Sequence, residues 1–125
     1  MEQRIKTYRD LKVWQKAREL VLVSYRAAKL LPADEKYALT SQIKRAATSI
    51  PANIAEGFGR TASKDREHFY VIAQGSLYEL DSHLQIARDL GFIDEVSHEA
   101  TQKSLEETGK LLSAFIRTHR ARSNL

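Results

Sequence analysis

Few residues of this chain have the types and spacing that catalysis or metal binding requires. Glu79 and His83 stand four positions apart, which places both on one face of a helix and could form a fragment of a metal site. A di-iron bundle would need two Glu-x-x-His pairs, and the sequence contains only one, at residues 95–98. A glutamate and a histidine four residues apart are more often a simple contact along one helix than a metal site. We therefore interpret the Glu79–His83 pair as structural and expect no bound metal or cofactor.

Motifs for nucleophilic catalysis and phosphate binding are also missing from the sequence. There is no cysteine and no Gly-x-Ser-x-Gly, and Gly57 and Gly59 lack the remaining pattern of a phosphate-binding loop. The lack of cysteine excludes disulfides and thiolate ligands and suits a reducing cytosol. We therefore expect a non-enzymatic, cytoplasmic protein. An unrecognised nuclease or metal enzyme is the less favoured interpretation.

Neither a membrane span nor a signal peptide is predicted. No apolar run approaches the ~20 residues that cross a bilayer. The first ten residues, MEQRIKTYRD, lack the apolar core of a secretory signal. We expect no membrane partner.

The basic residues are distributed unevenly along the chain. The net charge is +4, yet residues 1–62 hold 12 Lys and Arg against 6 Asp and Glu, and residues 63–116 hold 5 against 10. This pattern fits either two complementary protein surfaces or a basic surface for RNA or DNA. The cations that would contact phosphates in the second case are Lys12, Lys16, Lys44, Arg45, Arg60, Arg117, Arg120 and Arg122.

The elements that must position these residues are predicted to be helices. Only two prolines and five glycines interrupt 125 residues, and apolar residues recur at three- and four-residue steps. We expect an N-terminal arm at 1–9, a single domain at 10–120 and a frayed tail at 121–125, with fraying beginning near Thr118. The domain should be all-α, an antiparallel up-down-up-down four-helix bundle, with helices at about 10–31, 35–58, 63–90 and 95–120.

Helix ends and core faces can be assigned from the same pattern. Gly91 should stop the third helix, whose inner stripe is predicted to include Phe69, Ile72 and Leu90. The first half of the fourth helix offers little apolar area. The predicted N-caps of the four helices are Asp10, Asp34, Ser63 and Asp94.

The stretch 39–60 carries one apolar stripe with Pro51 in its middle. Proline removes a backbone donor and crowds the carbonyl four residues earlier, that of Ala47, so we predict a kinked second helix. Thr48, Ser49 or Asn53 could supply a hydrogen bond to that carbonyl. Asn53 and Glu56 are predicted to make polar contacts to a neighbouring helix or loop.

The first helix carries more apolar surface than one core contact needs. A second stripe runs beside the first, and we predict that it forms a homo-oligomer interface. Its members are Val13, Leu20, Val23, Ala27 and Leu30. The alternative is that the first helix lies centrally in a monomer.

Four segments resemble the 23S rRNA intervening-sequence protein family, whose members are usually called four helix bundle proteins. They are YRDLKVWQKA at 8–17, LTSQI at 39–43, SIPANIAEG at 49–57 and GSLYEL at 75–80, and the resemblance covers roughly residues 8–116. The motif positions it implies, which have no proven role, are Ser49, Pro51, Asn53, Glu56 and Gly57.

The resemblance implies a bacterial, antiparallel four-helix bundle that assembles as a ring-like homopentamer and has no known catalytic activity. The family is similar to the accessory variability proteins of diversity-generating retroelements, basic pentamers that bind nucleic acid and a reverse transcriptase. We therefore expect a homo-oligomer that binds RNA or DNA. The alternative is a structural oligomer with a protein partner.

Overall fold

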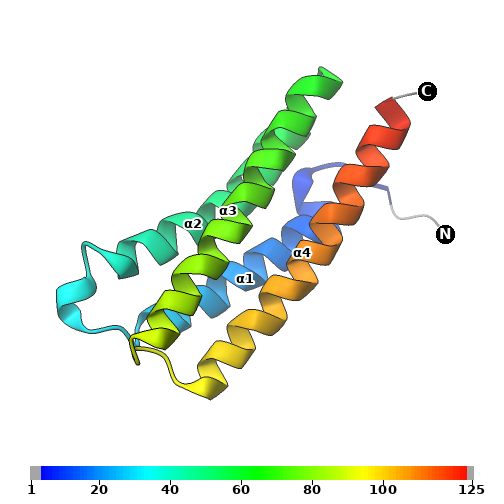
Figure 1. The fold of residues 1–125 in the computed structure, drawn as a ribbon. Helices are drawn as coiled ribbons and strands as arrows, with labels where there is room; N and C mark the ends of the chain where they lie inside the picture. The colour runs from blue at the N-terminus through cyan, green and yellow to red at the C-terminus, as the bar shows by residue number, and fades with distance from the viewer. Residues whose placement is uncertain (1–3, 124–125) are drawn as a thin grey trace.

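Four α-helices make up most of the computed structural model, which describes residues 4–123 (Figure 1). Two short 3-10 turns, Tyr8–Asp10 and Ala33–Glu35, precede the first and second helix. The described residues contain no strand, and the all-α, four-helix prediction is confirmed. The helices are α1 (Lys12–Ala28), α2 (Leu39–Phe58), α3 (Ser63–Asp89) and α4 (Glu95–Ser123).

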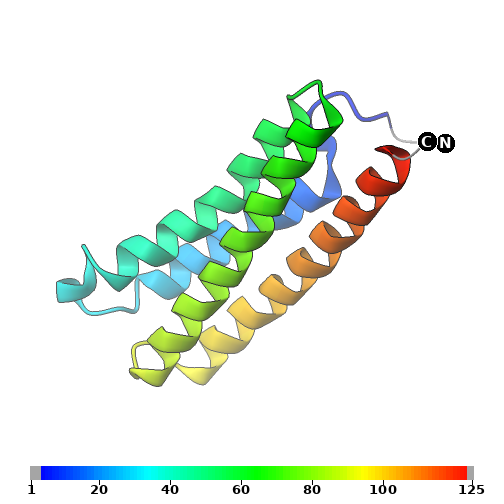
Figure 2. The same cartoon turned by 45° about the horizontal axis from the view of Figure 1, so that its top comes forward.

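Each helix packs against two others, so the four surround one core. α1 contacts α2 and α4, and α3 contacts the same two helices. Hydrogen bonds join Ser63 to His119, Gln74 to Ser113 and Asp81 to Gln102, so α3 and α4 run in opposite directions. Figure 2 shows the segment before α1 running between the tip of the α2–α3 pair and the end of α4.

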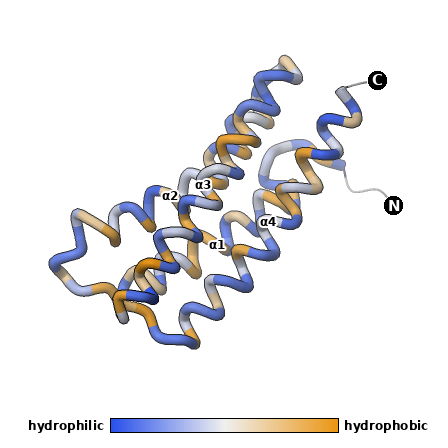
Figure 3. The backbone as a smooth tube through the Cα atoms, in the orientation of Figure 1, coloured by the Kyte–Doolittle hydropathy of each residue, from blue (hydrophilic) through white to orange (hydrophobic). Residues whose placement is uncertain are grey.

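One face of each helix supplies the core, which explains the mixture of hydrophobic and hydrophilic residues along every helix in Figure 3. On α2 the buried residues follow the predicted stripe, from Ile43 to Ile54. The large aliphatic side chains that are fully buried come from all four helices: Leu20, Ile43, Ile50, Ile54, Leu80, Leu84 and Leu112.

α2 continues through Pro51 as one helix. The donors predicted for the Ala47 carbonyl bond elsewhere. Thr48 Oγ1 donates to the Lys44 carbonyl (3.0 Å), and Asn53 Nδ2 donates to the Ser49 carbonyl (2.8 Å). These two side chains reach other carbonyls of their own helix, and Ser49 Oγ lies 2.8 Å from Ser76 Oγ, so a direct bond from any of the three to the Ala47 carbonyl is not found in the described part of the chain. The bend at Pro51 stays a prediction.

The predicted caps are right for one helix and wrong for three. Asp10 belongs to the 3-10 turn before α1, where its carboxylate accepts hydrogen bonds from the backbone of Lys6 and Thr7. Asp34 lies in the second 3-10 turn, and Ser63 is the first helical residue of α3, after Ala62. The extra turns displace Asp10 and Asp34 from the capping position, and α3 begins one residue earlier than a Ser63 cap requires.

The end of α3 and the start of α4 agree with the sequence. Gly91 has φ 78°, a left-handed conformation that costs glycine little, and the Phe92 amide donates to the Ala87 carbonyl (2.9 Å). Asp94 Oδ1 accepts from the Ser97 amide at 2.7 Å, as an N-cap does. These two residues therefore fix the α3–α4 turn.

The C-terminal end is more ordered than predicted. α4 stays helical from Thr118 through Ser123, because His119 and Ser123 contact Ser63 at the start of α3. The expected fraying is wrong for these residues. Residues 124–125 of the predicted tail and residues 1–3 of the predicted arm lie outside the described residues.

Most of the predicted inner stripe of α3 is buried, but some of its members are exposed and two residues outside it are buried. Ile72 and Leu90 are 38% and 56% exposed, whereas Tyr70 and Leu77 are buried. In the first half of α4 the buried residues are mostly polar, which is why the apolar pattern missed this face. They are His98, Thr101, Leu105 and Thr108.

The predicted oligomer stripe on α1 is wrong for three of its five members. Val13, Leu20 and Ala27 are buried inside the subunit, so no other subunit can contact them. Ala17 and Ser24 are buried together with these three residues. The core face of α1 therefore lies between the two predicted stripes. Val23 is half-buried, and Leu30 is 48% exposed.

Candidate nucleic-acid interface

A cavity of about 770 Å³ opens at one end of the bundle. The start of α1, the link between α2 and α3, and the last turns of α4 line it. In Figures 1 and 2 this is the end at which α4 finishes beside the tip of the α2–α3 pair. The cavity therefore joins segments that are far apart in the sequence.

Aromatic side chains form the inner wall of this cavity. Phe58, Tyr70 and Phe115 line it, and the Tyr70 and Phe115 rings meet edge to face with centroids 4.8 Å apart. The His119 ring stands against Tyr70 at 5.5 Å. Phe58 and Phe115 are half-buried and can contact an apolar or aromatic ligand, whereas the buried Tyr70 supports the wall from behind.

Tyr70 is 1% exposed, and its burial raises the pKa of its hydroxyl above the ordinary value of 10.0, although the charge of Arg66 acts in the opposite direction. The hydroxyl is therefore protonated at neutral pH. Tyr70 lines the cavity while remaining an uncharged group.

Gly57 allows Tyr70 to lie where it does. A Cβ atom at this position would stand 2.6 Å from Tyr70 Cε1 and 3.0 Å from the Arg66 carbonyl oxygen. The last turn of α2 therefore touches α3 without an intervening side chain. The final residue of the SIPANIAEG segment thus determines the shape of the cavity wall.

The mouth of the cavity is basic. Lys12, Arg66 and Arg122 line it, and no carboxylate does so within the described part of the chain. Arg66 Nε donates to the Arg60 carbonyl, and its guanidinium lies 5.6 Å from the centre of the Phe58 ring. None of the three cations forms an ion pair with a residue in 4–123. Their charges are available to an anion.

Hydroxyl groups complete the mouth. Thr61, Ser63 and Thr118 line it. His119 Nε2 lies 3.1 Å from Ser63 Oγ and 2.9 Å from the Ser63 carbonyl oxygen, which ties the end of α4 to the start of α3. The cavity thus combines an aromatic wall with cations and hydroxyls at its opening.

Four of the eight predicted cations lie at this end of the bundle. Lys12 and Arg122 line the cavity. Arg60 pairs with Glu56 at 2.9 Å, and Arg120 pairs with Glu67 at 3.1 Å, so the charges of these two arginines are compensated. Sequence reasoning missed Arg66, because it stands in the half of the chain where acidic residues outnumber basic ones.

The other four predicted cations lie elsewhere. Lys16 contacts Glu19 at 3.2 Å and Glu107 at 3.5 Å, and these carboxylates raise the pKa of the Lys16 ammonium, chiefly through the hydrogen bond to Glu19. Lys44 lies 5.2 Å from the centre of the Tyr25 ring, and Arg45 is exposed on α2. The structure does not bring the eight residues together.

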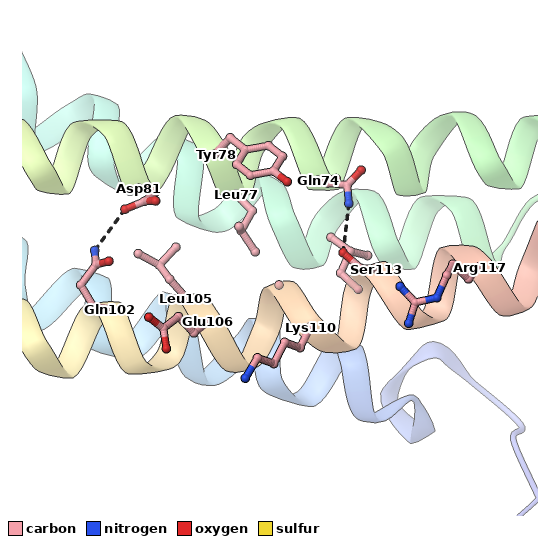
Figure 4. Close-up of a pocket in the computed structure, with 12 residues that line it drawn as sticks. Gln74, Leu77, Tyr78, Asp81, Gln102, Leu105, Glu106, Lys110, Ser113 and Arg117 are labelled. Atoms are coloured by element: carbon pink, nitrogen blue, oxygen red, sulfur yellow. Dashed lines mark hydrogen bonds between the residues drawn. The ribbon is translucent and has the colours of Figure 1, made fainter.

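Arg117 lines a different cavity, of about 490 Å³, between α3 and α4 (Figure 4). Asp81 and Glu106 share its lining with Lys110 and Arg117. Gln102 Nε2 donates to Asp81 Oδ1 at 3.1 Å. Because this groove mixes carboxylates with cations, it suits a polyanion less well than the basic cavity does.

The motif residues act mainly in joining α2 to α3. Ser49 Oγ lies 2.8 Å from Ser76 Oγ, and Asn53 Nδ2 donates to Ser49 Oγ at 2.9 Å. Glu56 binds the loop residue Arg60, as predicted, whereas Asn53 bonds within its own helix and reaches α3 only through Ser49. These contacts fix the helix pair that carries the cavity wall.

The other candidate chemistry is structural. His83 Nε2 lies 3.4 Å from Glu79 Oε1, and no set of three metal-ligating side chains occurs in the described residues. His98 is buried, with no partner for Nε2 among residues 4–123, and His119 bonds to Ser63. Neither histidine stands beside a second ligand that would complete a metal site in the described part of the chain.

The architecture is that of a small all-α helical bundle with a basic, aromatic-lined cavity at one end. A family model described as 23S rRNA-intervening sequence protein matches residues 9–114, and the chain belongs to that family. None of the helices in the described part is both long and apolar enough to span a membrane.

One of several solved structures that match the chain has a closely similar fold. It is a protein of unknown function from the S23 ribosomal protein family of Bacteroides thetaiotaomicron, with a TM-score of 0.76 and 27% identity over 83% of this chain and 97% of that one. No protein with a curated description matches the chain.

Proposed function

We propose that this protein acts by binding RNA or DNA through the basic mouth of the cavity at the end of the bundle. The observation that carries the proposal is the set Lys12, Arg66 and Arg122, which line one opening with no carboxylate among the described lining residues. Lysine and arginine contact phosphate oxygens, and such contacts supply most of the non-specific affinity for nucleic acid.

The family supports this proposal only indirectly. Its description connects the family with an intervening sequence of 23S rRNA, and the structural neighbour is of unknown function. We propose a binding protein rather than an enzyme, because the cavity presents cations, hydroxyls and aromatic rings.

A homo-oligomer is the second part of the proposal, and the outer face of α3 is its best-supported interface. Val71, Ile72, Tyr78 and Ile86 are exposed there, and the exposed Gly75 lies among them with open space for at least 4 Å around the place that a Cβ atom would take. Exposed apolar residues on one helix face favour contact with a protein surface. The resemblance to pentameric relatives suggests a second copy as the partner.

The proposed binding is tested with labelled single-stranded RNA, single-stranded DNA and duplexes in a salt series. Fluorescence anisotropy should show binding at low salt and a steep loss of affinity between about 50 and 200 mM salt. Failure of every oligonucleotide to bind at low salt would contradict the proposal. The structural oligomer with a protein partner would then be the better account.

A further inference from the structure

The aromatic wall of the basic cavity is not needed for contact with phosphates alone. Contact with phosphates requires only cations at the surface. Lys12 and Arg122 are exposed and could make such contacts even if no cavity lay beside them. Phe58, Tyr70 and Phe115 line a space behind them of a size typical of small-molecule sites. The wall therefore indicates a ligand with a flat, apolar body as well as a negative charge.

We infer that the cavity holds the base of an unpaired nucleotide, with the attached phosphate at Lys12, Arg66 and Arg122. The inference rests on the proposed function and specifies it: the preferred ligand is a single strand or an unpaired end rather than a continuous duplex. Aromatic side chains hold unpaired bases in many single-strand-binding proteins, because every base has an aromatic face.

The arrangement of the groups matches the two ends of a nucleotide. The exposed Lys12 and Arg122 can meet a phosphate that remains partly in water, and the half-buried rings of Phe58 and Phe115 offer the apolar surface for a base. Arg66 connects the two regions, because its guanidinium lies near the Phe58 ring while its charge faces the same opening. Thr61 and Thr118 add hydroxyls that can bond to base edges or to a ribose.

Charge complementarity distinguishes this occupant from an apolar peptide or a second helix. An apolar segment would leave three cations at the mouth without an anion, whereas a base with its phosphate fills the cavity and neutralises the charge. A fatty acid shares the combination of an anion and an apolar body, so the test below includes one.

The experiment fills the cavity without removing any cation. Ala114→Phe places a ring from α4 into the space, and Thr118→Trp blocks the mouth from an exposed position, so that at least one variant retains the fold. Ala100→Phe, on an exposed site of the same helix, is the matched control. Circular dichroism melts check each variant.

Binding of a short single-stranded RNA and of a blunt duplex is compared in wild type and these three variants. Loss of one base-stacking contact should weaken single-strand binding about tenfold in the blocked variants, while duplex binding and the Ala100→Phe protein stay unchanged. Adenosine monophosphate should compete with the single strand, and ribose 5-phosphate, which has no base, should not.

Each failure has its own signature. Equal binding of single strand and duplex, unaffected by both blocking variants, would overturn the base-binding inference and leave the proposed function intact. Competition by palmitate but not by adenosine monophosphate would also overturn the inference. If no nucleic acid binds at low salt, both proposals are wrong.

Discussion

At the scale of single residues, Gly57 controls how closely α2 approaches α3. The ring of Tyr70 occupies the space that a side chain at position 57 would need. Since interiors are close-packed, even one added methyl group must displace the ring or the helix. The residue is therefore structural, and it acts on the candidate site by shaping the cavity wall.

Gly57→Ala should lower the free energy of unfolding by roughly 1–3 kcal/mol, because overpacking forces shifts of Tyr70 and the α3 backbone. Gly59→Ala is the matched control two residues away. A Cβ there would meet nothing closer than 3.6 Å, and its φ of −78° suits alanine, so stability should be unchanged or rise by about 0.4–1 kcal/mol. Urea denaturation measures both variants, and a Gly57→Ala protein as stable as wild type would contradict the account.

Asp94 should make stability depend on pH. Hydrogen bonds from Ser97, first from its backbone amide, lower the pKa of the Asp94 carboxyl below its usual 3.8. A lowered pKa in the folded state gives stability that is present above 3.8 and is lost as the pH falls through the folded-state value. Asp94→Ala should therefore lower the Tm at pH 7, and the difference from wild type should shrink below pH 3.8.

Glu99→Ala is the control for this prediction, because Glu99 is an exposed carboxylate on the same helix without a capping bond in the described structure. Its Tm should follow that of wild type across the pH series. A Tm difference for Asp94→Ala that stays the same from neutral pH down to well below the folded-state pKa would show that the cap does not act through its charge.

At the scale of elements, α1 and α4 bury some polar side chains that are hydrogen-bonded and others that have no bond within the described residues. Thr108 Oγ1 donates to the Ser104 carbonyl (2.8 Å) and lies 3.3 Å from the Lys16 carbonyl of α1. Ser24 Oγ is buried and has no partner among residues 4–123. A buried hydroxyl that is bonded stabilises the fold, whereas one without a partner costs desolvation.

Ser24→Ala should raise the free energy of unfolding by about 1 kcal/mol, because it removes an unsatisfied hydroxyl and introduces a better helix former. Thr108→Val should lower it by about 1 kcal/mol, because it keeps the shape and removes a bonded hydroxyl. Thermal and urea melts measure both variants. Changes of the same sign in the two proteins would show that burial of these hydroxyls was assigned wrongly.

The sequence was sufficient for elements whose cause is local. The stripe of α2, Gly91 and Asp94 could all be recognised, because apolar periodicity, a left-handed stop and a cap depend on neighbouring residues. The end of α4 could not, because its order comes from contacts with Ser63, far away in the chain. The core face of α1 lies between two equally apolar stripes, and periodicity alone cannot tell which residues face the core. The pattern therefore assigns Leu20 to an oligomer interface, although it is buried inside the subunit.

The candidate site shows the same division. Lys12 and Arg122 were predictable as cations, yet only the fold shows that they share an opening. Arg66 was hidden in an acidic region, and Tyr70 lay outside the predicted stripe of α3. Both residues are placed at the site because α2 packs closely against α3 at Gly57. Such a contact between two helices cannot be recognised from the periodicity of one segment.

At the scale of the whole molecule, the proposed assembly depends on the outer face of α3. Gly75→Glu introduces a charge at the centre of this face, where the subunit has open space, so the variant should fold and fail to assemble. Ala100→Glu adds the same charge on α4 and should assemble normally.

Light scattering after size exclusion measures the mass of each protein. Wild type should exceed the subunit mass of 14.2 kDa, and Gly75→Glu should approach it. A wild-type protein that elutes as a 14.2 kDa monomer would contradict the assembly proposal and would leave the nucleic-acid proposal to stand alone.

The central claim is that nucleic-acid binding depends on where the positive charges lie and not on the net charge. Two triple variants separate the position of the charges from their number. Lys12→Gln, Arg66→Gln and Arg122→Gln remove the cations of the cavity mouth. Lys16→Gln, Lys44→Gln and Arg45→Gln remove three predicted cations elsewhere. Each variant loses three charges, so both change from a net +4 to +1.

The most direct measurement is the salt dependence of single-stranded RNA binding by these two variants and wild type. The slope of log affinity against log salt should fall by about 2 for the cavity variant and stay near the wild-type value for the other. Equal losses in both variants would contradict the account, because binding would then follow net charge and not the basic end of the bundle.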